Sequence, residues 1–206
     1  MTFEEKKEKL KEIYHAFEKE VEEYKKSAIC KPGCAYCCIH FGSVDITTLE
    51  GIIIRDRVNS FAKPLKNRIK KKIAQNKKLK EKGKVAQCPF LKEDKTCRIY
   101  DIRPFSCRQL YSLRECDGRG PTVHRQAVDL AEKTVQKLQQ LDPTGYSGHI
   151  SFIIHLLDKP EFRDLYLAGG FNPAQIMGFG KTHDIIINSP KGPTSDTFTL
   201  REGDLL

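Results

Sequence analysis

Eight cysteines lie within residues 30–116, and four of them fill the nine-residue run Cys30-Lys-Pro-Gly-Cys34-Ala-Tyr-Cys37-Cys38. The other four follow at nearly even intervals: Cys88, Cys97, Cys107 and Cys116. Isolated structural cysteines behave as small buried hydrophobes and would be scattered along the whole chain. Thiols crowded in this way bring soft sulfur ligands to a common point, as zinc, iron and iron–sulfur sites require. The spacing therefore predicts that all eight cysteines bind metal.

The run itself indicates how the sulfurs are shared. Cys30, Cys34 and Cys37 can reach one metal centre because Pro32 and Gly33 let the chain turn between them. Cys38 directly follows Cys37, and consecutive side chains diverge, so a single zinc ion would use only one of the two. Eight thiols suffice for two four-sulfur sites, or for one site with spare thiols.

Three interpretations of the cysteines compete. An iron–sulfur cluster, with four irons and four sulfides (4Fe-4S) as the favoured form, accounts for the surplus of thiols and for the lack of His pairs at ligand spacing. A zinc site would contribute roughly 10–16 kcal/mol of folding free energy. A thioredoxin-like pair of Cys34 and Cys37 lacks the alternating strand–helix context of that motif. We expect iron–sulfur ahead of zinc, and both ahead of the dithiol.

Composition bears on the compartment. No segment approaches the ~18 consecutive apolar residues of a membrane span, and the stretch from Met1 to Glu8 lacks the apolar region of a signal peptide. We therefore expect a cytoplasmic protein that spans no membrane, in which the thiols stay reduced and free to bind metal. A chain of 206 residues does not need disulfides to fold, because a chain of this size buries roughly 70% of its unfolded surface. Four disulfides are a minor alternative.

The positive charge is concentrated in one segment. Residues 63–84 contain eleven Lys or Arg and one acid, Glu81, whereas the whole chain carries +9. Such a segment can bind an acidic protein, either a redox partner or a substrate, but a solvated, lysine-rich helix face is the favoured interpretation. No aromatic residue interrupts the lysines, so base stacking is not expected there and nucleic acid is not the predicted partner.

The remaining pattern is helical. Thr2 with Glu5, and Thr47 with Glu50, form capping boxes. Apolar residues at helical spacing predict helices near residues 3–27, 48–58, 64–83, 123–141 and 160–168. The polar stretch 92–95 predicts a tight turn, at most a short β-hairpin. The expected fold is mainly α, with helices around an irregular cysteine-rich centre. We expect one helical metal-binding domain over residues 1–189, with its metal-binding core at 28–120, and a flexible tail at 190–206.

Four motifs together resemble a known family: the cysteine run, Cys88-Pro-Phe-Leu, Cys97-Arg-Ile-Tyr, and Arg103-Pro-x-x-Cys107-Arg. They are similar to those of the YkgJ-type cysteine-cluster proteins, which are described as zinc- or iron-chelating, and the resemblance covers about residues 28–116. It implies that the family's cysteines correspond to Cys30, Cys34, Cys37, Cys38, Cys88, Cys97 and Cys107. Cys116 matches less closely because the spacing varies there. A related segment in flagellin lysine N-methylases is thought to hold an iron–sulfur cluster, which favours iron.

Two arginines lie close to the cysteines in the sequence. Thiolates around a metal leave net negative charge in a medium of low dielectric, and Arg103 and Arg108 could neutralise it and donate hydrogen bonds to sulfur. The alternative is that these arginines cap helix ends or pair with a carboxylate such as Asp101.

Three functions remain open. The first is an iron–sulfur protein with an electron-transfer or other cluster-dependent role. The second is an enzyme that uses S-adenosylmethionine, because Cys30-x3-Cys34-x2-Cys37 is similar to the radical enzyme signature. Against this enzyme, the repeating strands of a partial barrel are missing, and the surplus cysteines would fill the open iron. The third is an interaction protein shaped by structural zinc.

Overall fold

The structure is a computed structural model, and it describes residues 1–41, 43–118 and 120–183. Most of these residues are helical, and the described chain contains one sheet of two short strands, which confirms the expected mainly α fold. In chain order the elements are α1 (Phe3–Glu20), α2 (Glu22–Lys25), η1 (Cys37–Phe41), β1 (Asp45–Thr47), α3 (Thr48–Ser60), α4 (Lys63–Glu81), η2 (Tyr100–Ile102), α5 (Phe105–Arg108), α6 (Arg125–Leu141), β2 (Ser147–His149), α7 (Ile150–Leu157), α8 (Pro160–Leu167), η3 (Pro173–Gln175) and α9 (Ile176–Thr182).

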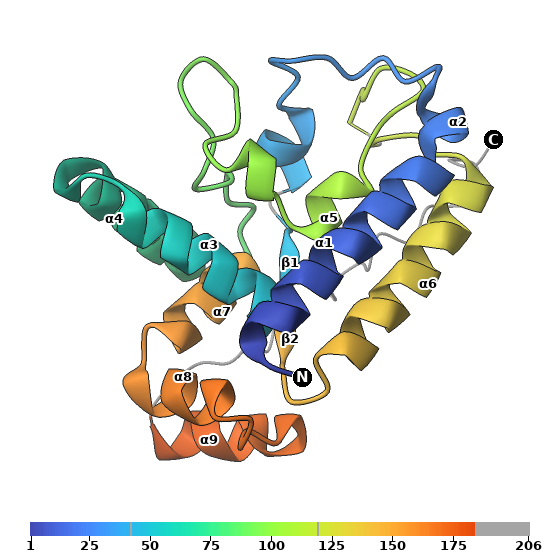
Figure 1. Ribbon diagram of the computed structural model, residues 1–206. Coiled ribbons are helices and arrows are strands. Elements are labelled where there is room, and N and C mark those ends of the chain that lie inside the picture. Colours follow the sequence, from blue (N-terminus) through green and yellow to red (C-terminus); the bar gives the residue numbers. More distant parts are fainter. Residues whose placement is uncertain (42, 119, 184–206) are drawn as a thin grey trace.

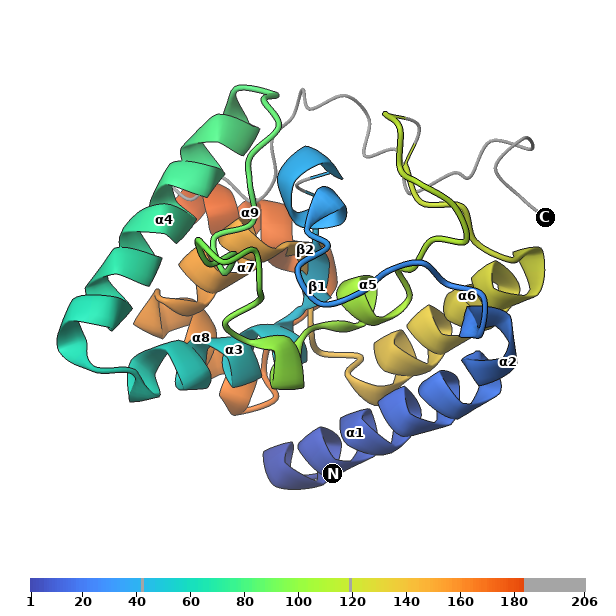
Figure 2. The same ribbon diagram turned by 90° about the horizontal axis from the view of Figure 1, so that it is seen from above.

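The helices form two groups. Helices α1 and α6 lie side by side in one group, whereas α3, α4 and α7 form the other, with α8 beside α7 (Figure 1). The short sheet and α5 lie between the two groups in both views (Figures 1 and 2). The irregular segments that carry the cysteines lie at the end of the molecule drawn at the top of Figure 1, and Figure 2 shows them between α4 and α6.

The α1–α6 group buries one apolar face of each helix. Helix α1 begins at a capping box in which Thr2 accepts a hydrogen bond from the backbone of Glu5 and the Glu5 carboxylate accepts one from Thr2. The buried apolar side chains recur every three or four residues along α1 and α6, which brings them onto one face of each helix. This cluster contains Leu10, Tyr14, Phe17, Val21, Leu49, Phe105, Tyr111, Val123, Ala127, Ala131, Leu138 and Leu141.

The other group surrounds α7, which is buried along nearly its whole length. Because α7 is apolar on every side, it must be covered by neighbours, and α3, α4 and α8 provide that cover. Helix α3 begins at the second predicted capping box, in which Thr47 and Glu50 bond reciprocally. The cluster contains Val44, Ile46, Ile52, Ile54, Val58, Ile69, Ile73, Phe90, Ile99, Ile150, Ile153, Ile154, Leu156, Leu157, Phe162, Tyr166, Phe171 and Ile176.

The sheet ties the cysteine-bearing end to α7. Strands β1 and β2 are antiparallel, with Asp45 opposite His149 and Thr47 opposite Ser147. The sequence analysis did not predict this pairing. The turn predicted at residues 92–95 does form, and it closes one antiparallel bridge between Leu91 and Cys97. Lys95 adopts a left-handed conformation there, with φ of 61°.

Two local predictions differ from the structure. The helix expected over residues 3–27 stops at Glu20, where the N–H of Val21 bonds back to the carbonyls of Phe17 and Lys19, and α2 follows as a separate turn. Cys37 and Cys38 lie in the π-helical turn η1 rather than in a loop. The predicted tail at 190–206 lies outside the described residues. No helix in the described part of the chain combines the length and apolar character needed to cross a bilayer.

Candidate metal centre

The eight cysteines are brought near one another by segments that are separate in the sequence, and none of the eight forms a disulfide. Cys30 and Cys34 are exposed, and the other six are partly buried. The interactions between the thiols divide them into two groups of four. We call Cys38, Cys88, Cys97 and Cys107 the inner group, and Cys30, Cys34, Cys37 and Cys116 the outer group.

The inner group draws on three separate segments of the chain. The backbone N–H of Cys88 donates to the carbonyl of Cys38 at 2.8 Å, and the two thiols are also hydrogen-bonded to each other. The bridge to Leu91 positions Cys97, and the short helix α5 carries Cys107. Cys88, Cys97 and Cys107 all pack against the core around α7.

The inner thiols differ in acidity. The hydrogen bond from Cys88 lowers the pKa of Cys38 to about 7, so Cys38 gives up its proton first. The same bond, followed by burial, raises the pKa of Cys88. Burial raises the pKa of Cys97 and Cys107, and the charges of neighbouring inner thiolates, Cys38 among them, add to the increase. Because a thiolate in this group raises the pKa of its neighbours, all four can be ionised only if a cation compensates the charge.

The outer group is held by a backbone contact between distant segments. The N–H of Ile29 donates to the carbonyl of Ser112 at 2.9 Å, which places Cys30 beside the segment that leads to Cys116. A turn between Lys31 and Cys34, with Gly33 at φ +88°, then brings the thiol of Cys34 into a hydrogen bond with that of Cys30.

The fourth outer thiol belongs to Cys37. Burial and then the neighbouring charges of Cys116, Cys30, Cys38 and Cys34, in that order, together raise the pKa of Cys37 to about 12. Three of these four neighbours belong to the outer group. Cys37 therefore belongs mainly to the outer thiols, although its sequence neighbour Cys38 belongs to the inner group.

Arg103 lies beside the inner group. Its positive charge opposes the increase in pKa of both Cys97 and Cys107. The guanidinium lies 4.2 Å from the ring centre of Tyr100, and Nη2 is 3.8 Å from a carboxylate oxygen of Glu18. The Nε atom is buried and has no hydrogen-bond partner in the described part of the chain. A buried N–H without an acceptor is costly, so this donor suits a sulfur acceptor beside it.

Arg108, by contrast, is engaged with other protein groups. Its Nη1 donates to Glu18 at 2.7 Å, Nε donates to the carbonyl of Arg103 at 2.8 Å, and Nη2 donates to the carbonyl of Asp101 at 3.2 Å. The guanidinium also covers the ring of Tyr14, 4.4 Å from its centre. These contacts fix the segment that carries Arg103 and Cys107, so Arg108 supports the position of both.

Glu50 is a residue of the site's framework that the sequence analysis did not identify. Its side chain is buried, and one carboxylate oxygen accepts hydrogen bonds from the hydroxyl of Tyr14 and, at 2.7 Å, from the N–H of Phe105. It thus joins α1 and α3 to the start of α5, which carries Cys107. In the sequence, the capping box with Thr47 already explained why a glutamate stands at position 50. Nothing else in the sequence indicated that its side chain is buried.

No three Cys, His, Asp or Glu side chains of the described residues are already arranged to hold a single metal ion. The thiols of each group are close enough to affect one another's charge, yet they are not gathered around one ion.

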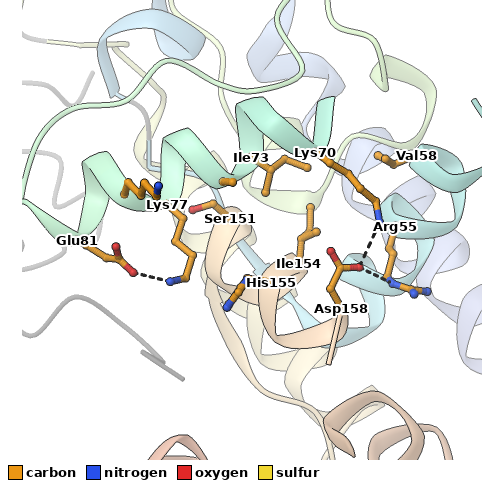
Figure 3. Close-up of a pocket in the computed structure, with 12 residues that line it drawn as sticks. Arg55, Val58, Lys70, Ile73, Lys77, Glu81, Ser151, Ile154, His155 and Asp158 are labelled. Atoms are coloured by element: carbon orange, nitrogen blue, oxygen red, sulfur yellow. Dashed lines mark hydrogen bonds and ion pairs between the residues drawn. The ribbon is translucent and has the colours of Figure 1, made fainter. Parts of the chain in front are cut away.

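The structure also has a cavity of about 200 Å³ between α3, α4 and α7 (Figure 3). In the close-up, Asp158 of α7 pairs with Arg55 of α3 at 3.1 Å and with Lys70 of α4 at 3.8 Å. Lys77 and His155 also line the cavity, but no cysteine does. This cavity is therefore separate from both thiol groups.

Comparison with known proteins identifies the family of the chain. No curated protein and no solved structure matches the chain. A family model with the motif name CxxCxxCC, described as a "putative zinc- or iron-chelating domain", matches residues 29–140. That span exceeds half of the 206 residues and includes all eight cysteines. The match confirms the resemblance to the cysteine-cluster proteins, and the chain belongs to the CxxCxxCC family.

Proposed function

We propose that the inner group holds an iron–sulfur cluster, with 4Fe-4S as the favoured form, and that the protein acts in electron transfer or another cluster-dependent role. One observation carries this proposal: Cys88, Cys97 and Cys107 pack against the core, and a backbone hydrogen bond ties Cys38 to Cys88. Beside them lies a buried arginine N–H that has no partner among the described residues. Soft thiolates are the ligands that iron–sulfur clusters use.

The supply of thiols favours a cluster over a single zinc ion. A closed zinc site uses four ligands, with histidine among them in many proteins, whereas this chain has eight cysteines within residues 30–116. Iron–sulfur clusters are held by cysteine thiolates. The surplus of thiols therefore supports the cluster.

The charge and the buried N–H of Arg103 fit a cluster bound by the inner group. A cluster with four thiolates is anionic and exposes sulfur atoms as acceptors. The guanidinium supplies positive charge to Cys97 and Cys107, and its buried Nε supplies an N–H for a sulfur. The core side chains that pack against Cys88, Cys97 and Cys107 leave these thiols only partly exposed to water. When bound, the cluster would supply one-electron chemistry, which these residues tune through charge and burial.

The inner group also argues against an S-adenosylmethionine enzyme. Such an enzyme leaves one iron of its cluster without a cysteine ligand so that the cosubstrate can bind there. Four inner thiols supply a ligand for every iron of a 4Fe-4S cluster. An electron carrier needs no open iron, so four cysteines suit a carrier better.

The basic helix α4 suits an acidic protein partner. Of the cations at residues 63–84, only Lys70 and Lys77 form ion pairs with carboxylates in the described part of the chain. The C-terminal end of α4 contacts the inner group's surroundings, because Asn76 donates to the carbonyl of Gln87, next to Cys88, at 2.9 Å. A partner attracted to the positive charge of α4 would therefore arrive near the inner group. The thiols must stay reduced to bind a cluster, and the cytoplasm is a compartment that keeps them reduced.

The test begins with protein prepared without oxygen. Dithionite should bleach its visible absorption and produce an EPR signal, and added S-adenosylmethionine should leave that signal unchanged. A colourless protein that carries zinc would contradict the proposal, and a signal altered by S-adenosylmethionine would favour the enzyme. Reduction by an acidic flavodoxin should slow about tenfold when Lys71 and Lys72 are changed to Glu, because steering contributes about 10–10³ to association rates. Changing Lys133 and Lys137 of α6 to Glu is the matched control.

A further inference from the structure

We propose that the cavity between α3, α4 and α7 binds a small carboxylate with an apolar body, of about the size of benzoate. The cavity has a volume of about 200 Å³, and no cysteine lines it. It lies in a different part of the molecule from the inner thiols, so this inference goes beyond the proposed function and does not depend on it.

The cavity is formed where one face of each of three helices meets the others. Helix α4 contributes six lining residues whose spacing of three or four places them on a single face of that helix. They are Lys70, Ile73, Ala74, Lys77, Lys78 and Glu81. The lining residues of α3 and α7 recur at the same spacing. The cavity thus has three regular walls, each built by one helix.

The middle of the cavity is apolar. Figure 3 shows the side chains of Ile73 and Ile154 between the charged groups. Val58 of α3 also lines the cavity, and all three side chains are buried. A cavity of about 150 Å³ with apolar walls of this kind holds benzene. The larger volume here therefore has room for a hydrocarbon ring with one polar substituent.

One end of the cavity carries two basic side chains around one carboxylate. Asp158 lies 3.1 Å from Nε of Arg55 and 3.8 Å from Nζ of Lys70 (Figure 3). Asp56, 4.0 Å from Nη1 of Arg55, does not line the cavity. This end therefore has one positive charge more than it has negative charge.

The other end also has more basic than acidic side chains. Lys77 pairs with Glu81, and its Nζ lies 5.2 Å from the ring centre of Phe152. Lys78 also lines the cavity and forms no ion pair with a carboxylate in the described part of the chain. His155 adds a ring N–H that can donate a hydrogen bond. The excess of positive charge at both ends favours an anion.

The walls and the charges together select the class of ligand. An inorganic anion would lose its water against the apolar middle, and a neutral hydrocarbon would leave the basic side chains without a partner. A carboxylate with an apolar body meets both requirements, and the planar guanidinium of Arg55 is suited to a carboxylate. Ala74, Lys78 and Asp158 are exposed, so such a ligand can enter from solvent without opening the core.

The test begins with calorimetric titration of the full-length protein with benzoate. Two further probes separate the features of the ligand. Benzamide has the same ring without the charge, and inorganic phosphate has the charge without the ring. The inference predicts that benzoate binds at least about tenfold more tightly than either of the other two.

Matched charge variants locate the site. Lys70→Gln with Lys78→Gln leaves each carboxylate of the cavity with a basic partner but removes the excess of positive charge. Lys71→Gln with Lys72→Gln removes the same charge from exposed positions of α4 that do not line the cavity. The first pair should weaken benzoate binding about tenfold, and the second pair should leave it unchanged.

A second pair of variants tests the space itself. Ala74→Leu places a larger apolar side chain in the cavity and should abolish benzoate binding, whereas Gln75→Leu, at an exposed position outside the lining, should not. Thermal unfolding checks that each variant is folded. The inference is overturned if wild type does not bind benzoate, if benzamide or phosphate binds as tightly, or if a variant and its control lose binding equally. Benzoate binding by a protein that holds no iron and sulfide would contradict the proposed function alone.

Discussion

The carbonyl of Cys38 accepts a hydrogen bond from the N–H of Cys88 at 2.8 Å, although fifty residues separate them in the chain. This bond ties Cys38 to the inner thiols, while the charges of Cys116 and Cys30 are the strongest influence of any neighbour on the pKa of Cys37. Two adjacent residues thus have different neighbours, and the proposed function of the inner group depends on this division.

The first prediction concerns Arg103. Its charge lies near Cys97 and Cys107, so it stabilises the more negative, reduced state of a cluster bound there. Arg103→Gln should lower the reduction potential, by on the order of 60 mV if the one-electron equilibrium changes tenfold. A redox titration followed by EPR measures this shift. The control is Arg163→Gln on α8, where the arginine pairs with Asp164. It also removes one positive charge, but it should leave the reduction potential unchanged. An equal shift in both variants would contradict the role of Arg103.

The second prediction concerns the buried contact between Tyr14 and Glu50. Tyr14→Phe removes the hydroxyl that donates to the Glu50 carboxylate and leaves a buried charge with one bond fewer. Hydrogen bonds to charged groups contribute about 1.5–3 kcal/mol, so the free energy of unfolding should fall by that amount. Urea unfolding measures it. Tyr100→Phe, at a side chain that is 63% exposed, should change stability by less than about 0.5 kcal/mol. Equal effects of the two substitutions would refute the prediction.

The third prediction compares two helical glycines. A Cβ at Gly51 would lie 2.7 Å from Cγ2 of Ile153 and 2.8 Å from Cδ1 of Leu157, where α3 meets α7. Gly51→Ala should therefore destabilise the fold by about 1–3 kcal/mol. A Cβ at Gly178 of α9 meets nothing within 4 Å, so Gly178→Ala should stabilise by up to about 1 kcal/mol. Thermal unfolding of both variants checks the signs, and a neutral Gly51→Ala would contradict the close packing.

The fourth prediction concerns pH. Burial lowers the pKa of His155, and the charges of Lys77 and Lys159 lower it further, whereas Asp158 and Glu81 act in the opposite direction. As pH falls below about 6.5, the unfolded chain therefore binds this proton before the folded one does, and stability is lost. His155→Gln should lose less stability than wild type between about pH 7.5 and about pH 5.5 in urea unfolding at matched metal content. Parallel losses in the two proteins would show that His155 titrates equally in both states.

Much of the helical framework could be predicted from local sequence. The capping boxes of Thr2 and Thr47 marked the starts of α1 and α3 because a cap and its partner lie only three residues apart. Apolar residues at helical spacing located α4, α6 and α8, because this pattern also repeats over only three or four residues. The boundaries were less accurate where tertiary contacts decide them, as at Val21, whose buried side chain ends α1.

The contacts that assemble the site could not be predicted in this way. Strands β1 and β2 are only three residues long each, and about a hundred residues separate them, so neither carries a strand pattern. The eight thiols were recognised from their spacing, but their division depends on backbone bonds such as Ile29 to Ser112, which no local motif encodes. Glu50 was missed because its local capping role was sufficient to explain it.

The most direct test of the account is the iron and acid-labile sulfide content of the anaerobically prepared protein. The account predicts iron and sulfide in about equal amounts, with about four of each for every cluster, and a brown colour that bleaches on reduction. Zinc as the main metal, without sulfide and without colour, would contradict it.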